Sequence, residues 1–321
     1  MCRTIKVDTI KKYILSVAQF LSLFGDHPRD FRKECQTSTT VAVELTKVYA
    51  ELARWEKVPN RREPFTLEML MDMHENFASS GLGPDSLLAA LVDWFEVGLF
   101  AGSRLSEWAQ DAYHEKINNY KKDVRDETRA FTLLDFRFED GNRGRYSALE
   151  ASKADVPMAK CWTTYRTQKN GQNGEERLQT RNPRTGGKCF VSAILRIIRR
   201  FTRLVGETDT TTPLSVYQCP ARQEILLITS IDIEKEMRSV AARVYKLDPI
   251  KDAEALQRWS SHSLRVGACV ILHSMGITET QLKWLLRWRS DAFMVYLRNT
   301  AILANAQYET LDKASAMPHF L

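Results

Sequence analysis

The stretch from residue 259 to residue 298, WSSHSLRVGACVILHSMGITETQLKWLLRWRSDAFMVYLR, constrains the fold more than any other part of the chain. Apolar residues recur in it at helical spacing, and turn residues interrupt the pattern twice. The stretch therefore predicts three consecutive helices. Ser260 or Ser261 can cap the first helix, and Gly276 stands where that helix should stop. A further cap at Ser290-Asp291 opens the third helix.

Four side chains of this stretch suggest chemistry when they are taken together. His262 and Arg265 are three residues apart, so they share one face of the first helix. Trp288 lies on the second helix, and Tyr296 lies about a turn and a half into the third. Singly, each has a plainer interpretation as a structural or core residue, and Tyr308 is a rival to Tyr296. As a set they suggest a site that holds a phosphodiester while a phenol attacks it.

Composition sets the broad class of protein. A chain of 321 residues has room for two domains, and 44% apolar with 27% charged residues is usual for a globular protein. It has no apolar run long enough to span a membrane, and its first residues lack the pattern of a secretory signal. Six scattered cysteines without metal-binding spacing indicate reduced thiols, an intracellular protein and no metal site. A net charge of +6 fits a protein that binds a polyanion without requiring one.

The N-terminal part, residues 1–60, predicts a small helical domain. Two amphipathic helices are expected there, the second from Ser38 to Trp55, which is few for an independent domain. Residues 1–62 hold 12 Lys and Arg against 7 Asp and Glu, so most of the net charge lies in this part. The proline-bracketed segment VPNRREPFT then reads as a linker, and its Arg61 and Arg62 are candidate DNA contacts.

Two upstream motifs supply further candidates. GSRLSE follows a strongly apolar segment and predicts a helix start with Arg104 and Glu107 one turn apart; the plainer interpretation is a surface ion pair. Residues 160–182 alternate around two Asn-Gly dipeptides and predict a β-hairpin. Lys169 lies at the tip of this hairpin, where a solvated turn lysine is the more ordinary interpretation.

The predicted helix over residues 188–204 carries four arginines on one face, and we expect no acid to balance them. These are Arg196, Arg199, Arg200 and Arg203. Such a stripe is more often a solvated surface. Four unpaired arginines nevertheless make a phosphate-facing helix a second interpretation, so they are candidate DNA-binding residues.

The candidates fit the needs of phosphoryl transfer to a tyrosine. Free tyrosine has a pKa of about 10, so Tyr296 needs a base, and His262 can accept its proton. Arg104 and Arg265 can clamp the phosphate, because the guanidinium fork matches two non-bridging oxygens and keeps its charge.

The remaining candidates assist the same step. The leaving group is a sugar hydroxyl that needs a proton, and Lys169 on a hairpin tip is placed to supply it. Trp288 can donate its indole N–H to a non-bridging oxygen and bury the site. Glu107 would orient a neighbouring cationic group rather than react.

This ordered set resembles the motifs of the tyrosine recombinase (phage-integrase) family. The family pattern is an arginine in Gly-x-Arg-x-x-Glu, a lysine on a β-hairpin, His-x-x-Arg, a His or Trp, and the tyrosine. The chain has these in order as GSRLSE, TQKNGQNG, HSLR, RWRSD and VYLRN. RWRSDAFMVYLR is most similar to recombinases of eukaryotic mobile elements, the Crypton and DIRS-like groups. Two features depart from the family: the N-terminal domain is short, and Trp288 and Tyr296 are eight residues apart rather than nine.

The resemblance implies a mainly α fold with a small β-sheet. A helical DNA-binding domain of the core-binding, SAM-like kind (residues 1–60) would join an α/β catalytic domain (residues 61–321). The chain would cleave and rejoin double-stranded DNA at specific sites through a 3′-phosphotyrosyl link to Tyr296, with no metal, ATP or other cofactor. Four protomers would assemble on two DNA sites, a monomer or dimer would exist free, and the segment after Tyr296 would dock on a neighbour. The expected location is the nucleus in a eukaryotic host and the cytoplasm otherwise, with no membrane partner.

Two other functions stay open at this point. One is a DNA-binding descendant of a mobile-element recombinase that no longer cleaves. The other is a type IB topoisomerase, which shares the chemistry but relaxes supercoils instead of exchanging strands. The His-x-x-Arg motif favours the recombinase over the topoisomerase.

Overall fold

The computed structural model describes residues 6–24, 32–33, 41–54, 62–123, 130–166, 173–184, 188–288 and 290–297. The chain divides into two compact units, Met1–Arg61 and Arg62–Leu321. Among the described residues, no helix is both long and apolar enough to cross a bilayer.

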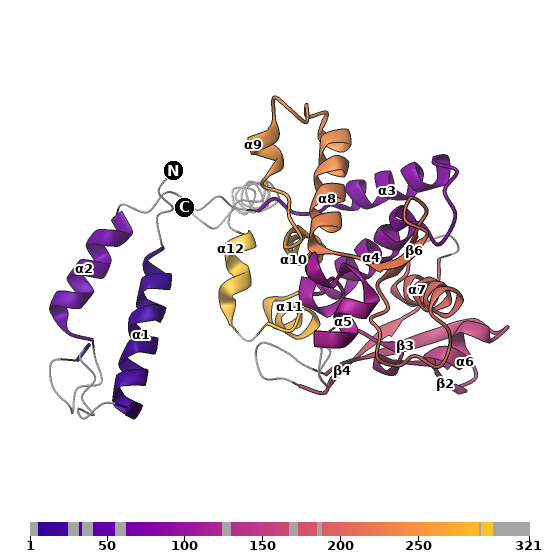
Figure 1. Cartoon of the computed structure of the whole chain (residues 1–321), viewed down its shortest axis with the longest axis horizontal. Coiled ribbons are helices and arrows are strands. Elements are labelled where there is room, and N and C mark those ends of the chain that lie inside the picture. Colours follow the sequence, from indigo (N-terminus) through magenta and orange to yellow (C-terminus); the bar gives the residue numbers. More distant parts are fainter. Residues whose placement is uncertain are drawn as a thin grey trace, which may run out of the picture. The chain divides into compact units, whose positions relative to one another are not determined.

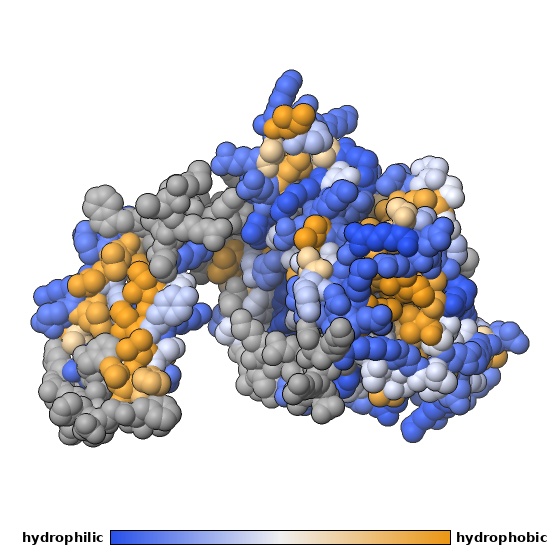
Figure 2. Space-filling model, in the orientation of Figure 1, coloured by the Kyte–Doolittle hydropathy of each residue, from blue (hydrophilic) through white to orange (hydrophobic). Residues whose placement is uncertain are grey.

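The first unit contains α1 (Val7–Phe24) and α2 (Val43–Arg54), which contact each other (Figure 1). Much of their apolar surface faces solvent: Phe20 is 61% exposed, and α2 contains no buried residue. Figure 2 shows this apolar surface on both helices. A DNA-binding role for this unit stays a prediction.

The core helix of the second unit is α4 (Leu87–Ala101), which is buried along nearly its whole length. Ser86 caps it by accepting a hydrogen bond from the backbone N–H of Ala89, and Gly102 ends it in the left-handed region with φ +56°. A helix that is apolar on every side is stable only when other elements surround it. Those elements are α3 (Leu67–Ser79), α7 (Phe190–Leu204) and α10 (Ser263–Ser274).

A four-stranded antiparallel sheet packs on the other side of α7 (Figure 1). Its strand order is β2 (Arg145–Ser147), β1 (Phe136–Asp140), β3 (Met158–Tyr165), β4 (Glu175–Thr180). Trp162 of β3 pairs with Leu178 of β4, so these two strands form the expected hairpin. The hairpin tip, including Lys169, lies outside the described residues. Strand β1 begins only at Phe136, because Thr132 and Asp135 close a short 3₁₀ turn before it.

A separate two-stranded sheet consists of β5 (Val216–Cys219), which the sequence pattern did not predict, and β6 (Glu224–Leu227), which it did. Then α8 (Ser230–Tyr245) begins after Thr229, whose hydroxyl accepts a hydrogen bond from the backbone N–H of Asp232. The remaining elements are α5 (Ile117–Asp123), α6 (Ala148–Lys153), α9 (Ala253–Leu256) and the 3₁₀ turns η1 (Leu105–Glu107), η2 (Tyr113–Glu115), η3 (Leu133–Asp135) and η4 (Asp291–Phe293).

The C-terminal stretch forms three helices, as its apolar spacing predicts: α10, α11 (Glu279–Leu285) and α12 (Met294–Leu297). They share a small apolar cluster of their own, which includes Cys269, Leu286 and Phe293. The expected cap of α10 is wrong, because α10 has no side-chain cap; the Ser260 backbone N–H instead donates to the hydroxyl of Ser263.

The start of the second unit is anchored on α10. The backbone N–H of Phe65 donates to the carbonyl of Ser263 (2.9 Å), and a Cβ placed on Gly267 would lie 2.0 Å from the carbonyl oxygen of Phe65. Only glycine permits this approach, which explains the glycine in HSLRVGAC. With its helices and one small main sheet, the chain confirms the predicted class, mainly α with a small β-sheet.

Candidate active site

A hydrogen bond joins the residue before α10 to α12. His262 Nε2 lies 2.6 Å from the phenolic oxygen of Tyr296. Although part of His262 is exposed, the surrounding protein atoms displace water from its ring, and Arg265 and Arg62 are nearby, so its pKa is lowered. Neutral imidazole is therefore the favoured form at neutral pH, and it can accept a proton.

Tyr296 is half-buried, with a pKa above its usual value. Burial of the phenol is the largest cause, and the positive charge of Arg265 opposes it. The hydroxyl thus stays protonated at neutral pH and needs a base before it can attack anything. Its 2.6 Å contact with His262 provides that base in the correct protonation state.

Arg265 is a buried cation without a carboxylate of its own. It is 4% exposed and donates to the backbone carbonyls of Gly102 (2.7 Å) and Leu286 (2.6 Å). Among the described residues it forms no ion pair. Its burial and the neighbouring Arg104 and Arg287 lower its pKa to about 9. An anion bound here would relieve this repulsion.

Glu107 holds two arginines at the edge of the same site. It is 4% exposed and accepts the guanidinium of Arg287 with both oxygens, at 2.7 and 3.0 Å. It also accepts the backbone N–H of Arg104 (2.8 Å) and lies 3.4 Å from the Arg104 guanidinium. Arg104, Arg265 and Arg287 therefore bring three positive charges near a single paired carboxylate, which favours an anionic ligand.

The sequence argument missed Arg287. This residue is 2% exposed, has φ +57°, and its guanidinium lies 3.6 Å from the centre of the Tyr165 ring. The sequence offers one indication that Arg287 is buried: a charged residue directly follows the apolar pair Leu285 and Leu286. That signal could not identify the partner, because Glu107 lies 180 residues earlier in the chain.

Trp288 covers the centre of the site. Its half-buried ring lies 4.4 Å from the guanidinium of Arg265 and 5.8 Å from the ring of Tyr296. The indole Nε1 is buried and has no hydrogen-bond partner within the described ranges. The site thus combines stacked aromatic rings, a cationic centre and a donor that a ligand oxygen would satisfy.

The structure brings together most of the residues that the sequence singled out: Arg104, Glu107, His262, Arg265, Trp288 and Tyr296. Lys169 and Arg61 lie outside the described residues, as does the segment after Tyr296 that was expected to dock on a neighbour. Arg62 is close enough to lower the pKa of His262, and it donates to the carbonyl of Gln257. A DNA contact by Arg62 stays a prediction. No group of three His, Cys, Asp or Glu side chains that could hold a metal ion occurs in the part of the chain that the structure describes.

The expectation that no acid balances the arginine stripe of α7 is wrong. Arg196 pairs with Asp93 (2.6 Å) and Glu96 (2.9 Å), and the nearly fully buried Arg200 pairs with Asp93. The carboxylates belong to α4, about a hundred residues earlier, so the periodicity of α7 could not reveal them. Arg200 is 2% exposed, so it does not belong to a solvated surface stripe.

The other two arginines of the stripe, Arg199 and Arg203, lie at the surface. Arg203 pairs with Asp85 (2.5 Å), and Arg199 donates to the carbonyl of Ser152 (3.0 Å). Both remain exposed at the surface. DNA binding by this face stays a prediction. The ion pairs of Arg196, Arg200 and Arg203 are enough to explain these three arginines by a structural role.

Comparison with known proteins gives matches among solved structures. No family model matches the sequence, and no curated protein matches it. A structure of the Tn1549 transposon integrase with transposon right end DNA is 14% identical with TM-score 0.44, covering 96% of this chain and 80% of the other. The XerH site-specific recombinase on a palindromic difH substrate is 14% identical with TM-score 0.47, covering 98% of this chain and 68% of the other. Both are tyrosine recombinases, the family that the motifs resemble; the likeness to the Crypton and DIRS-like groups stays a prediction.

Proposed function

We propose that the chain is a tyrosine recombinase, which cleaves and rejoins DNA at specific sites through a 3′-phosphotyrosyl intermediate, without metal or ATP. The observation that carries the proposal is the 2.6 Å hydrogen bond between His262 and Tyr296, next to the buried Arg265, which forms no ion pair with any described residue. A protonated phenol, a neutral base and an unsatisfied cationic site are the three things that attack on a phosphodiester requires.

The cleavage step follows from the placement of these groups. The Tyr296 oxygen attacks the phosphorus and its proton passes to His262 Nε2. A phosphorus–oxygen bond to tyrosine forms, and the bond from phosphorus to the 5′ oxygen of the next nucleotide breaks. Lys169 is the proposed donor of the proton that this 5′ oxygen takes up. Attack by a 5′-hydroxyl of another strand reverses the step and completes the exchange.

The transition state carries extra negative charge on the non-bridging oxygens. Arg265 and Arg104 are the proposed partners of these oxygens, and Trp288 contributes its unpaired indole N–H. Glu107 acts through the arginines that it holds. Loss of one such donor costs roughly 3–4 kcal/mol of transition-state stabilisation in comparable sites.

The proposed partner is double-stranded DNA, bound by four protomers on two duplexes. The integrase and recombinase structures named above are complexes with DNA by their descriptions. The basic net charge of +6 supports a polyanionic partner.

The proposal is tested by trapping the covalent intermediate. A DNA duplex that binds the full chain is first selected from randomised sequences. This duplex is then nicked close to each candidate cleavage position, so that the short strand with the 5′-hydroxyl diffuses away after cleavage. Denaturing gels should then show a protein–DNA adduct. Tyr296→Phe should abolish the adduct and leave DNA affinity within a few-fold, because only the nucleophilic oxygen is removed.

Tyr308→Phe is the matched control and should still form the adduct. An adduct that survives Tyr296→Phe and disappears in Tyr308→Phe would reassign the nucleophile. Binding without an adduct in any variant would indicate a DNA-binding descendant. Relaxation of supercoiled plasmid without strand exchange would indicate a topoisomerase.

A further inference from the structure

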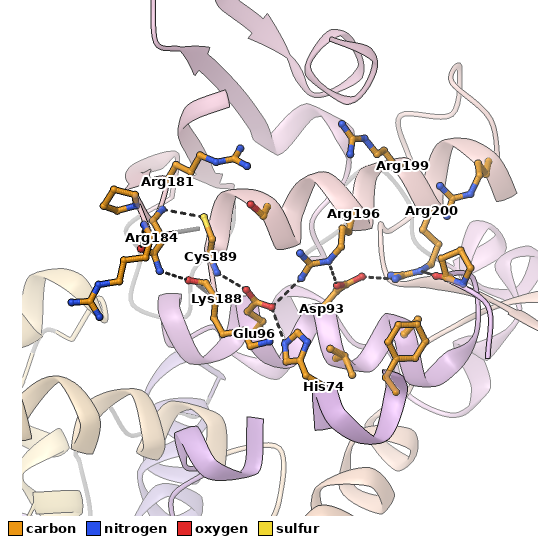
Figure 3. Close-up of a pocket in the computed structure, with 18 residues that line it drawn as sticks. His74, Asp93, Glu96, Arg181, Arg184, Lys188, Cys189, Arg196, Arg199 and Arg200 are labelled. Carbon is orange, nitrogen blue, oxygen red and sulfur yellow. Dashed lines mark hydrogen bonds and ion pairs between the residues drawn. The ribbon is translucent and has the colours of Figure 1, made fainter. Parts of the chain in front are cut away.

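A pocket of about 700 Å³ lies between α3, α4, α7 and the segment that follows β4 (Figure 3). None of the candidate catalytic residues lines it. Its volume is that of a small-molecule site rather than of a surface that a duplex could cover.

The lining of this pocket is strongly cationic. Seven of its side chains are Arg or Lys, and only two, Asp93 and Glu96, are carboxylates. Both carboxylates are already satisfied within the protein. Asp93 accepts Arg196 and Arg200, and Glu96 accepts Arg196 (2.9 Å), the His74 ring (3.1 Å) and the backbone N–H of Cys189 (2.5 Å). Arg203 pairs with Asp85 next to the pocket, so the positive charge that no carboxylate balances within the described residues belongs to Arg181, Arg184, Lys188 and Arg199.

This excess charge lies at two ends of the pocket. Figure 3 shows Arg181, Arg184 and Lys188 at one end and Arg199 at the other, beside Arg200, whose charge Asp93 already balances. Within the described ranges, neither the Arg184 guanidinium nor the Lys188 amine has a hydrogen-bond or ion-pair partner, and neither Arg181 nor Arg199 pairs with a carboxylate.

One buried atom and one half-buried side chain independently favour an anion in the pocket. The Nη1 atom of Arg200 has no hydrogen-bond partner in the described part of the chain, although the residue is only 2% exposed. The pKa of Lys188 is lowered, because burial and the nearby charge of Arg196 outweigh the attraction of Glu96. An anionic oxygen in the pocket would satisfy the first group and stabilise the charged form of the second.

We propose that this pocket binds a short polyphosphate chain, either free or carried by a nucleoside. Arginine forks match phosphate oxygens in pairs, and a linear chain of phosphates can reach both cationic ends. The partly buried Phe77 and the side chains of Val92 and Pro84 add an apolar surface on which a base can lie. The proposal uses no residue of the proposed active site, so either proposal can fail without the other.

The test is isothermal titration calorimetry of the full chain with sodium tripolyphosphate, ATP and, as a single-charge-centre reference, inorganic phosphate, all at one ionic strength. The pocket variant is Arg184→Gln/Lys188→Gln, whose side chains have no partner that the change would strand. The matched control is Lys235→Gln/Lys251→Gln, which removes the same charge from exposed positions outside the pocket. Circular-dichroism melting checks that both variants fold.

The expected result is binding of tripolyphosphate or ATP at least tenfold tighter than inorganic phosphate, weakened tenfold or more in the pocket variant and unchanged in the control. Tighter binding of tripolyphosphate identifies a free chain, and tighter binding of ATP identifies a nucleoside-borne one. A ligand at saturating concentration should also raise the melting temperature of the wild type. Equal weakening in both variants, no binding, or tighter binding of a single-stranded oligonucleotide would each overturn the proposal.

Discussion

At the scale of single residues, environment decides which candidate can act. His262 and Tyr296 each have an ordinary interpretation, but the structure shifts their pKa values in opposite directions: that of the histidine falls and that of the tyrosine rises. The imidazole is then an acceptor and the phenol a donor over the same pH range. Such a pair is what a base-assisted attack needs.

The pH dependence of cleavage follows from the lowered pKa of His262. Only neutral imidazole can accept the proton, so the rate of adduct formation should rise with pH. Because the pKa lies below its usual value, the midpoint of the rise should lie below about pH 6.5. The measurement uses DNA far below saturation, so that the profile reports the free protein.

His262→Gln is the control for this profile. It should lower the plateau by roughly 10²–10⁴-fold and remove the acid limb, because the general base is gone. A midpoint at or above about pH 7 in the wild type would show that another group titrates.

At the scale of elements, pairing between helices explains the arginines of α7. Helical spacing placed Arg196, Arg199, Arg200 and Arg203 on one face correctly. Their carboxylate partners come from α4 and from Asp85 just before it. A face that looked suited to phosphate is thus largely an inter-helix contact that joins the two helices beside the pocket.

This contact predicts unequal effects along one helix face. Arg200→Met should lower the free energy of unfolding by about 3–5 kcal/mol, because it leaves Asp93 buried with one partner fewer. Arg199→Gln should change it by less than about 0.5 kcal/mol, because only an exposed hydrogen bond is lost. Urea unfolding measures both.

The double variant Asp93→Asn/Arg200→Met separates charge from packing. It should recover part of the unfolding free energy that Arg200→Met loses, because it removes the buried carboxylate that has one partner fewer. If Arg200→Met proved as mild as Arg199→Gln, the pair between α4 and α7 would not be a stabilising contact.

At the scale of the whole molecule, the site depends on segments that are far apart in sequence. Arg265 joins the ends of two segments by its bonds to Gly102 and Leu286, and Arg287 joins the C-terminal stretch to Glu107. These contacts bring Arg104 close to Arg265, which is also close to Tyr296, although Arg104 and Tyr296 are about 190 residues apart in the sequence. Arg287 is therefore a positioning residue, which acts through Glu107.

Changes at Arg287 should separate stability from cleavage. Arg287→Met removes the two-point partner of the buried Glu107, leaving it only its contacts with Arg104, and should cost about 3–5 kcal/mol of unfolding free energy. Arg287→Lys keeps the charge but loses the bidentate hydrogen bond to Glu107. DNA affinity should therefore stay constant, while the rate of adduct formation falls by roughly 10–100-fold. Affinity measurements and single-turnover adduct assays distinguish the two effects.

A double-mutant cycle with Glu107→Gln supplies the control. The coupling energy between Glu107 and Arg287 should be about 0.5–3 kcal/mol. Additive effects would mean that the pair does not act as a unit, and loss of DNA affinity in Arg287→Lys would assign the residue to binding.

The sequence by itself predicted what depends on local spacing. Apolar periodicity and turn residues predicted the three C-terminal helices, the β3–β4 hairpin and α7. The order of polar motifs named six of the residues that the candidate site brings together. These features could be predicted because each depends on residues that are close together in the sequence. The strand β5 escaped prediction, since a short strand has little pattern of its own.

Only the tertiary structure decided which charges meet. It paired Arg287 with Glu107, gave the α7 arginines the carboxylates of α4, and left Arg265 buried without one. Each outcome depends on residues about a hundred or more positions apart, and no local pattern encodes them. The physical reason is that a side chain's charge state and partners are set by burial and by neighbours in space, which exist only once the helices have packed.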